Sequence, residues 1–523
     1  MQSNRCEFKE VVLSLADFLP DDYLEAVCEA HAFLSGEDVR GLKSMATHPV
    51  SFFPVGFQSR LLSLLPKVGQ KVCRHPVAAS SRGATSRQFE LATRTAMAPL
   101  SGLGYYRIGE DGRLYLITKS EHYHTPLGHG FPGYGLVERA RRLGIPNATH
   151  NNTRGAITRL LEQELVAEAN GIQAGDPAAM EELLAAADCG HLNRVLNLET
   201  GSLAVEAALK MMLARFYRPQ GDSPTPKYEG RTPVFIVVGN DEGGLQANYH
   251  GTTILTQTMR GMWPEWTDSA SEKGLYQVRA VRPNRIEDFR TALAECDKQP
   301  YKVAGFFHEI VMMNYGARLL EREYLEQVYA LCQEADVPIL VDEIQSCLWA
   351  RDFYLFRDLG LKPTFVAVGK GLTGGEYAAS RILFCAAMDS LPQFGALVTN
   401  GQEELASLTY LISMRWAKAN AAVTSRIGEF YESRLREIAD QHRQCIVGIE
   451  GFRHLCSIKF HDMGTAKAFA ASLNQKGMDI SVQTYKADCP PSVLTKLPMI
   501  MGQGEVEWFL DRIQETLKSD LPG

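Results

Sequence analysis

The stretch VPILVDEIQSCLWARDFYLFRDLGLKPTFVAVGKGLTGGEY, residues 337–377, decides the fold. It contains two short apolar runs, VPILV at 337–341 and FVAVG at 365–369, which are bounded by Pro and Gly and rich in β-branched residues. Such runs are typical of strands buried in a parallel sheet. Each run leads to a charged residue, Asp342 after the first and Lys370 after the second. The chain between them is long enough to cross over and return to the same sheet.

We therefore expect Asp342 and Lys370 at the carboxyl ends of strands, where open α/β sheets place their ligands. A carboxylate and an amine that converge there, with glycines around the amine, indicate a pyridoxal phosphate (PLP) site. Lys370 would form a Schiff base with the cofactor, and Asp342 would keep the pyridinium nitrogen protonated. Taken singly, the lysine would be a solvated loop residue and the aspartate a helix cap, but their ordered pairing favours the cofactor.

Length and composition limit the remaining possibilities. A chain of 523 residues with 45% hydrophobic composition is long for one core and predicts two domains plus an extension. A net charge of −7 does not favour a nucleic-acid or membrane partner, and no apolar run reaches membrane-spanning length. The charged N-terminus does not resemble a signal peptide. The 11 scattered cysteines, without a CxxC pair, are typical of free thiols in a cytoplasmic protein rather than of disulfides or a zinc site.

The two charged motifs also resemble a known family. Asp342-Glu343-Ile344-Gln345 and Gly369-Lys370-Gly371 are similar to the DEVQ and GKG motifs of the class III aminotransferases, which are PLP-dependent enzymes of fold type I. The resemblance implies an α/β protein, with a large domain around a mainly parallel seven-stranded sheet and a small α+β domain. It also implies that Ile344 packs on one face of the cofactor ring and that Gln345 forms a hydrogen bond near the ring hydroxyl.

A second match lies where a predicted strand, RVLNL at 194–198, meets a predicted helix, AVEAALKMMLARFY at 204–217. The residues between them would lie at a helix N-terminus, where free amides and the helix dipole favour phosphate. Ser and Thr also begin many helices that bind no ligand. The family has NSGTEANEAALK here, and this match assigns the phosphate to Thr200, Gly201 and Ser202. Glu199 replaces the family's Asn, and we expect its carboxylate to point away.

Two further matches concern the ring and the substrate. Tyr249-His250-Gly251 resembles the family's aromatic-His-Gly motif, which implies that Tyr249 stacks on the cofactor and that His250 belongs to the same contact. The run VAGFFHE ends in Glu309 and resembles the family's VEP motif. The resemblance gives Glu309 a role in gating or binding substrate, and a structural ion pair remains equally open.

The segment before these motifs matches the family more loosely. DGRLYLI at 111–117 is similar to its early hairpin, and GHGFP at 128–132 is similar to its GHxHP motif. His122, His124 and His129 are close together in the sequence. A metal cluster is one interpretation, but supporting Cys or carboxylate ligands are missing. We favour a substrate-channel loop in which His129 contacts the substrate.

The segment TNGQEELA at 399–406 corresponds to the family's TFGGNPLA, with the Thr kept and GGNP lost. In the family this Thr reaches the phosphate of the neighbouring subunit. The resemblance therefore implies that Thr399 serves a second chain and that the protein is a homodimer with shared active sites. We expect a helical extension at 1–95, an N-terminal segment of the small domain at 96–155, the large PLP-binding domain at 156–400, and a linking helix with the rest of the small domain at 401–523.

The resemblance implies an aminotransferase that moves an amino group from an amine or amino acid to a keto or aldehyde acceptor through the Lys370 Schiff base. Its partners would be these small amine and carbonyl substrates. A racemase or aminomutase of the same fold stays open because the segments after Lys370 and Thr399 depart from the family. A non-catalytic protein on the same fold is a further alternative, although the intact lysine and aspartate argue against it.

Overall fold

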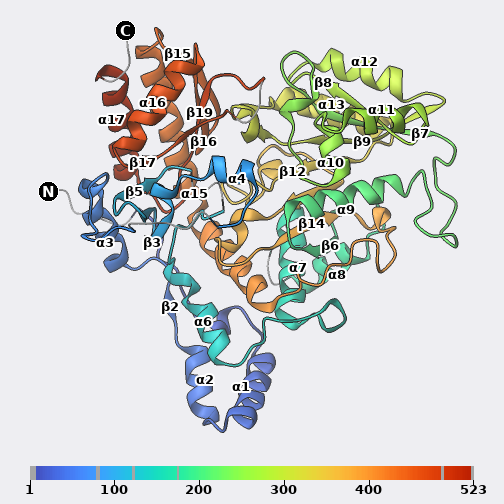
Figure 1. Cartoon of the computed structure of the whole chain (residues 1–523). Coiled ribbons are helices and arrows are strands. Elements are labelled where there is room, and N and C mark those ends of the chain that lie inside the picture. Colours follow the sequence, from blue (N-terminus) through green and yellow to red (C-terminus); the bar gives the residue numbers. More distant parts are fainter. Residues whose placement is uncertain (1–6, 78–82, 120–123, 174–175, 485–487, 520–523) are drawn as a thin grey trace.

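The computed structural model describes residues 7–77, 83–119, 124–173, 176–484 and 488–519. A large domain, green to yellow in Figure 1, lies beside a small domain in orange and red. A blue helical pair projects from the body, away from both. Within these ranges, every helix falls short of the length or hydrophobicity that crossing a membrane requires.

The large domain is built on one seven-stranded sheet. Its β12 pairs in parallel with the strand on either side, and only β14 runs against its two neighbours. This confirms the predicted mainly parallel sheet. The strand order is β6 (Arg194–Leu198), β14 (Ser380–Phe384), β13 (Phe365–Val368), β12 (Ile339–Asp342), β9 (Tyr301–His308), β7 (Thr232–Val238) and β8 (Gln277–Val281).

The two central strands are apolar throughout because both faces of the sheet are covered. All residues of β12 and β13 are buried. Alternate side chains enter different cores: Ile339 and Val341 join the core on one face, and Leu340 joins the core on the other. Helix α9 (Gly201–Leu213) belongs to the second core, and α12 (Ile286–Cys296) and α13 (Arg322–Glu334) contribute to the first. Period-two alternation between two apolar layers explains why the strands read as unbroken apolar runs.

The small domain combines the C-terminal part of the chain with strands from near the N-terminus. The long helix α15 (Glu404–Gln441) leads into an antiparallel sheet. In a second sheet, β17 pairs in parallel with β5, so residues 99–117 lie in this domain. Its elements are β15 (Ile446–Phe452), β16 (Leu455–Phe460), β19 (Ser492–Lys496), β18 (Ser481–Val482), β17 (Met478–Asp479), β5 (Leu114–Ile117), β4 (Tyr106–Gly109), β3 (Pro99–Leu103), α16 (Met463–Gln475) and α17 (Gln503–Ser519).

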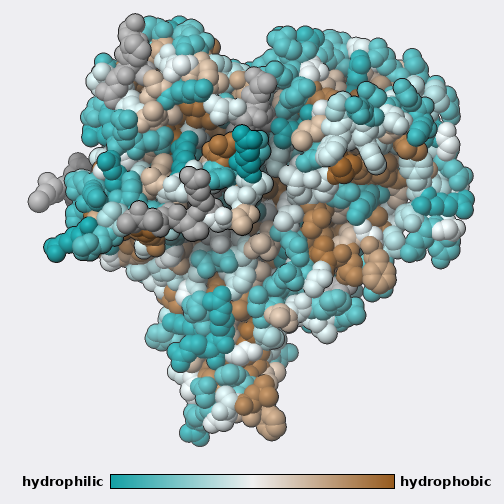
Figure 2. Space-filling view, viewed as in Figure 1, coloured by the Kyte–Doolittle hydropathy of each residue, from teal (hydrophilic) through white to brown (hydrophobic). Residues whose placement is uncertain are grey.

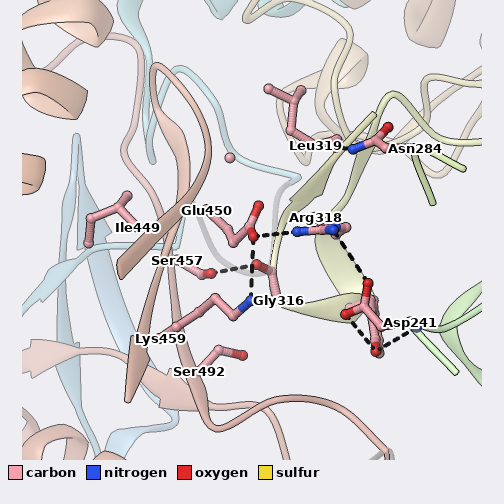
Figure 3. A network of polar contacts seen from close by, with 12 residues as sticks. Asp241, Asn284, Gly316, Arg318, Leu319, Ile449, Glu450, Ser457, Lys459 and Ser492 are labelled. Atoms are coloured by element: carbon pink, nitrogen blue, oxygen red, sulfur yellow. Dashed lines mark hydrogen bonds and ion pairs between the residues drawn. The ribbon is translucent and has the colours of Figure 1, made fainter. Parts of the chain in front are cut away.

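A polar network fastens the two domains to each other (Figure 3). At its centre is Arg318, on the short hairpin β10 (Val311–Met312) and β11 (Arg318–Leu319). Its guanidinium lies 2.7 Å from Glu450 in the small domain and 3.4 Å from Asp241 in the large one. Both carboxylates raise the pKa of Arg318, although burial opposes them. Because this hairpin directly follows β9, the network also restrains the end of that strand.

Several helices lie in the N-terminal part of the chain. Its helices α1 (Asp21–Ser35) and α2 (Val39–Thr47) form the projection in Figure 1. The surface of this projection is partly apolar in Figure 2, and Phe33 of α1 is 88% exposed. Phe8, in contrast, packs on Trp416 of α15, so only part of the extension covers the body. The remaining elements include β1 (Val12–Leu13), β2 (Val50–Ser51), α3 (Val55–Leu64), α4 (Arg87–Ala92), α6 (Gly135–Arg142), α7 (Ala156–Asn170), α8 (Pro177–Ala185), α10 (Ile254–Met259), α11 (Pro264–Glu272) and α14 (Leu355–Asp358).

Candidate active site

A cavity of about 490 Å³ opens at the carboxyl edge of the large sheet. Strands β12 and β13 deliver Asp342 and Lys370 to it, as their positions in the sequence predict. The loops after β6 and β7 form the adjoining walls. The other lining residues are His124, Glu199, Thr200, Gly201, Ser202, Tyr249, His250, Gly251, Ile344, Gln345, Gly375, Tyr377, Ala378 and Ala379.

Asp342 is held in place by two contacts at the end of β12. Its Oδ2 lies 3.0 Å from Nδ1 of His250, and its Oδ1 accepts a hydrogen bond of 3.1 Å from the backbone N–H of Ile344. Both side chains are buried, with 6% and 1% exposed for Asp342 and His250. The other ring nitrogen of His250, Nε2, has no hydrogen-bond partner among the described residues. The carboxylate is therefore fixed in one orientation at the floor of the cavity.

Lys370 follows β13 in an unusual backbone conformation. Its φ of 44° lies in the left-handed region, which only a few per cent of non-glycine residues adopt. The preceding Gly369 approaches β14 closely, since a Cβ there would lie 2.8 Å from Oγ of Ser380. The lysine side chain is exposed within the cavity. Surrounding protein atoms lower the pKa of Lys370 by desolvation, against the raising effect of Glu309 and Asp342.

Beside Lys370, Glu309, Gln345 and Lys496 form a buried polar cluster. The side-chain amide of Gln345 donates a 2.8 Å hydrogen bond to Oε1 of Glu309. The amide oxygen of Gln345 has no hydrogen-bond partner among the described residues. Lys496, fully buried, donates to the backbone carbonyl of Gln345, and its ammonium lies 3.8 Å from the ring centre of Trp349. Burial and the charge of Lys370 lower the pKa of Lys496, while Glu309 opposes this.

The N-terminus of α9 forms the far end of the cavity. Thr200 occupies the N-cap position, and Gly201 and Ser202 begin the helix. The hydroxyl of Ser202 accepts a 3.1 Å hydrogen bond from the backbone N–H of Thr252. Gly201 has to be small, because a Cβ there would lie 2.6 Å from Cδ1 of Ile344. The close approach brings the free helix amides next to the end of β12.

Tyr249 lies on the cavity wall, with the guanidinium of Arg260 5.2 Å from its ring centre. Ile344 lines the cavity as well, in contact with the start of α9. Glu199, which we expected to point away, is also among the lining residues. The Glu199 substitution was visible in the sequence, but its place in the cavity depends on the turn that precedes α9.

Two predicted contacts, Thr399 and His129, are not among the residues that line the cavity. Thr399 is exposed and is not among the residues lining this chain's cavity. His129 exchanges backbone hydrogen bonds with Gly104 and is not among the residues that line the cavity, whereas His124 is. His122 lies outside the described residues. In the part of the chain that the structure describes, no group of three His, Cys, Asp or Glu side chains is arranged to hold a metal.

Sequence reasoning gave little weight to Lys496. It precedes Leu497-Pro498, in a segment that matches the family only loosely. The structure places Lys496 behind Gln345 rather than on the cavity wall. The available signal is a charged residue at the end of an otherwise uncharged strand, β19.

Comparisons with known proteins agree with this geometry. The acetylornithine aminotransferase of Thermosynechococcus vestitus is 27% identical over 284 residues, which cover 52% of this chain and 62% of that protein. The ornithine aminotransferase of Bordetella pertussis is 25% identical over 432 residues, or 81% of this chain and 91% of that protein.

Among solved structures, the ornithine aminotransferase of Toxoplasma gondii superposes with a TM-score of 0.65 at 18% identity, covering 84% of this chain and 96% of that one. This likeness confirms the predicted fold. The family model "Aminotransferase class-III" matches residues 149–517. That match covers most of the chain and includes β12, β13 and the loops after β6 and β7, so this protein belongs to the class III aminotransferase family and is a PLP-dependent aminotransferase.

Proposed function

We propose that this aminotransferase uses Lys370 as the covalent anchor of PLP and transfers an amino group between an amine or amino acid and a keto or aldehyde acceptor. One observation carries the proposal. Asp342 ends β12, Lys370 follows the adjacent parallel strand β13, and both line a single cavity with the N-terminus of α9 at its other end. An amine, a carboxylate and an anion site are the three groups that the cofactor requires of its protein.

The residues present fit the cofactor. The buried carboxylate of Asp342, oriented by His250, suits a protonated ring nitrogen. The amide oxygen of Gln345 lacks a hydrogen-bond partner among the described residues and suits the ring hydroxyl. Tyr249 and Ile344 would cover the two ring faces. Thr200, Gly201 and Ser202 would hold the phosphate at the N-terminus of α9.

When bound, PLP supplies an electron-withdrawing ring, and the chain supplies the proton carrier. Desolvation lowers the pKa of Lys370, so a larger fraction of its amine is neutral near pH 7 than in water. A neutral Nζ can take a proton from the substrate carbon and donate it again in a later step of the transfer. The hydrogen bond from Gln345 holds Glu309 beside this amine.

The substrate side of the cavity is rich in polar groups. Glu199 and His124 line it, and Glu309 lies close to Lys370. We assign Glu309 to substrate binding or gating, because carboxylates near the reacting centre favour a substrate that carries a cationic amine. The relatives named acetylornithine and ornithine aminotransferase support amine donors. His129 remains a proposed contact only for a substrate that extends out of the cavity.

We also propose a cytoplasmic homodimer with shared sites. Thr399 is exposed in the single chain, and the nearby Phe394 is 77% exposed. An exposed aromatic next to the segment expected at the interface supports burial by a second copy. The ten cysteines of the described residues are free thiols, which is typical of proteins kept in a reducing compartment.

A half-reaction tests the proposed function. Purified holoenzyme given an amine donor alone should lose the visible absorbance of the lysine-bound cofactor and release a carbonyl product in equal amount. Borohydride added before the donor should fix the cofactor to the peptide containing Lys370. A racemase or aminomutase would convert the donor without a lasting loss of absorbance, and a label on another lysine would overturn the assignment of Lys370.

A further inference from the structure

The amino edge of the large sheet, opposite the active site, carries a pair of thiols. Strand β14 runs against β13, so Phe384 at its end pairs with Phe365 at the start of β13. Cys385, the next residue, is therefore placed at the edge away from Lys370. Cys189 reaches it from the loop between α8 and β6, and the two sulfur atoms lie 3.0 Å apart. A disulfide needs a sulfur separation of about 2.05 Å, so an approach of about 1 Å would join them.

The two thiols differ in access. Cys385 is fully buried, and Cys189 is exposed. Cys189 lines a surface cavity of about 720 Å³ together with the cationic side chains of Arg215, Lys227 and Lys362. The carboxylate of Asp336 lies 2.7 Å from Nζ of Lys227 and also contacts Arg215. A small molecule can thus reach Cys189, whereas Cys385 is accessible only through Cys189.

The local charges favour a reactive thiolate on the exposed partner. Cys385 donates its S–H to the sulfur of Cys189, which lowers the pKa of Cys189 to about 7. Arg215 lowers it further, while burial and the carboxylates of Asp336 and Asp188 oppose the shift. The pKa of Cys385 is raised by the same contact and by burial. These properties suit Cys189 to attack a disulfide and Cys385 to resolve the resulting adduct.

We propose that Cys189 is a site of reversible thiolation by low-molecular-weight disulfides, such as glutathione disulfide, and that Cys385 resolves the adduct into an intramolecular disulfide. The three cations that line the cavity outnumber its two carboxylates, Glu326 and Asp336, so the cavity suits a disulfide that carries carboxylates. This site is independent of the cofactor and lies at the other end of the strands.

The chemistry takes two exchange steps. The Cys189 thiolate attacks one sulfur of glutathione disulfide, the S–S bond of the reagent breaks, and one glutathione thiolate leaves. Cys385 then gives up its proton to solvent or to the departing thiolate and attacks the sulfur of Cys189. A Cys189–Cys385 bond forms, and the second glutathione leaves. Two protein thiols are oxidised and one glutathione disulfide is reduced to two glutathione thiols.

Peptide mapping of the full-length, cofactor-loaded protein tests the proposal. Reduced protein is treated with glutathione disulfide at pH 7, remaining thiols are alkylated, and modified peptides are quantified over time. The expected product is a peptide pair linked through Cys189 and Cys385, reversed by dithiothreitol. Cys296 and Cys445, which are partly exposed and have pKa values raised by burial, serve as internal controls. We expect Cys189 to react about tenfold faster than either.

Two variants separate the steps. Cys385→Ser should stop at a stable Cys189–glutathione adduct, and Cys189→Ser should leave Cys385 as a free thiol. Equal modification of Cys189, Cys296 and Cys445 would overturn the proposal, as would a wild-type adduct at Cys189 that never converts to the linked pair. The wild-type map decides the question by itself if the Cys385→Ser protein does not fold.

Discussion

The two edges of the large sheet differ in what their strands deliver. At the carboxyl edge, parallel strands bring Asp342 and Lys370 together beside an α-helix N-terminus. At the amino edge, Cys385 arrives only because β14 runs in the opposite direction. The middle of the sheet is apolar and buried on both faces, so polar chemistry is confined to its ends. Strand direction, rather than composition, decides which edge a reactive side chain reaches.

Removing the lysine is expected to have the largest effect. Lys370→Ala should lower turnover by about 10⁴-fold or more, because it removes both the covalent anchor and the proton carrier. The variant should still bind PLP, but only reversibly, so that dialysis removes the cofactor. The matched change at the other edge, Cys189→Ser, should stay within about twofold of native turnover. A comparable loss from both changes would show that the two edges are not independent.

Asp342→Asn comes next. The amide keeps the shape of the side chain but not its charge, so the ring nitrogen loses a charge-assisted hydrogen bond. We expect turnover to fall by roughly 10²–10³-fold while far-ultraviolet circular dichroism stays native. Steady-state kinetics with saturating PLP measures this. Near-native turnover of the Asp342→Asn variant would show that Asp342 has no role in the mechanism.

Thr399→Val tests whether the carboxyl edge of one chain is completed by another. A hydroxyl bonded to a phosphate is worth roughly 1.5–3 kcal/mol, so PLP should bind about tenfold or more weakly. In a mixed dimer of a Lys370→Ala chain and a Thr399→Val chain, shared sites place both defects in one pocket. Such a hybrid should show about half of native activity, because the second pocket is intact. A fully active monomer would contradict this model.

Lys496→Met should change the pH profile more than the maximal rate. Lys496 and Lys370 are neighbouring amines, and removing the charge of one favours protonation of the other. The pKa of the Lys370 amine that is freed when substrate binds should therefore rise, and the acid limb of kcat should move to higher pH by about 0.5–1 unit. Lys496→Arg, which keeps the charge, is the control. If the acid limb of the pH profile does not move, Lys496 has only a structural role.

The smallest expected effect is on stability in acid. Burial lowers the pKa of His308, on β9, to about 3, while an unfolded histidine titrates near 6.5. Between these values only the unfolded chain binds the proton, so stability falls as pH falls, by about 1.4 kcal/mol per unit. His308→Gln should show a shallower loss from pH 6.5 to pH 5 in urea denaturation. An equal loss of stability in the native protein and in His308→Gln would contradict the lowered pKa of His308.

The sequence predicted the parts of the site that depend on short local patterns. The apolar runs located β12 and β13, and the charged residues after them located the carboxyl edge. The fold and the enzyme class are confirmed, whereas the individual roles of the site residues and the domain boundaries stay predictions. Lys496 and Gln345 are distant in the chain and meet only through tertiary packing. The Cys189–Cys385 contact joins a loop to a strand end in the same way. The direction of β14 is likewise set by tertiary pairing.

The backbone of Lys370 has an evolutionary consequence. A non-glycine residue held at positive φ costs of order 1–3 kcal/mol, and glycine in the same place would relieve that strain. Random drift should therefore replace this lysine with glycine or asparagine in any descendant that no longer needs the amine. A lineage that keeps Lys370 accepts a less stable fold in every generation, so its retention is a sign of selection on chemistry rather than on structure.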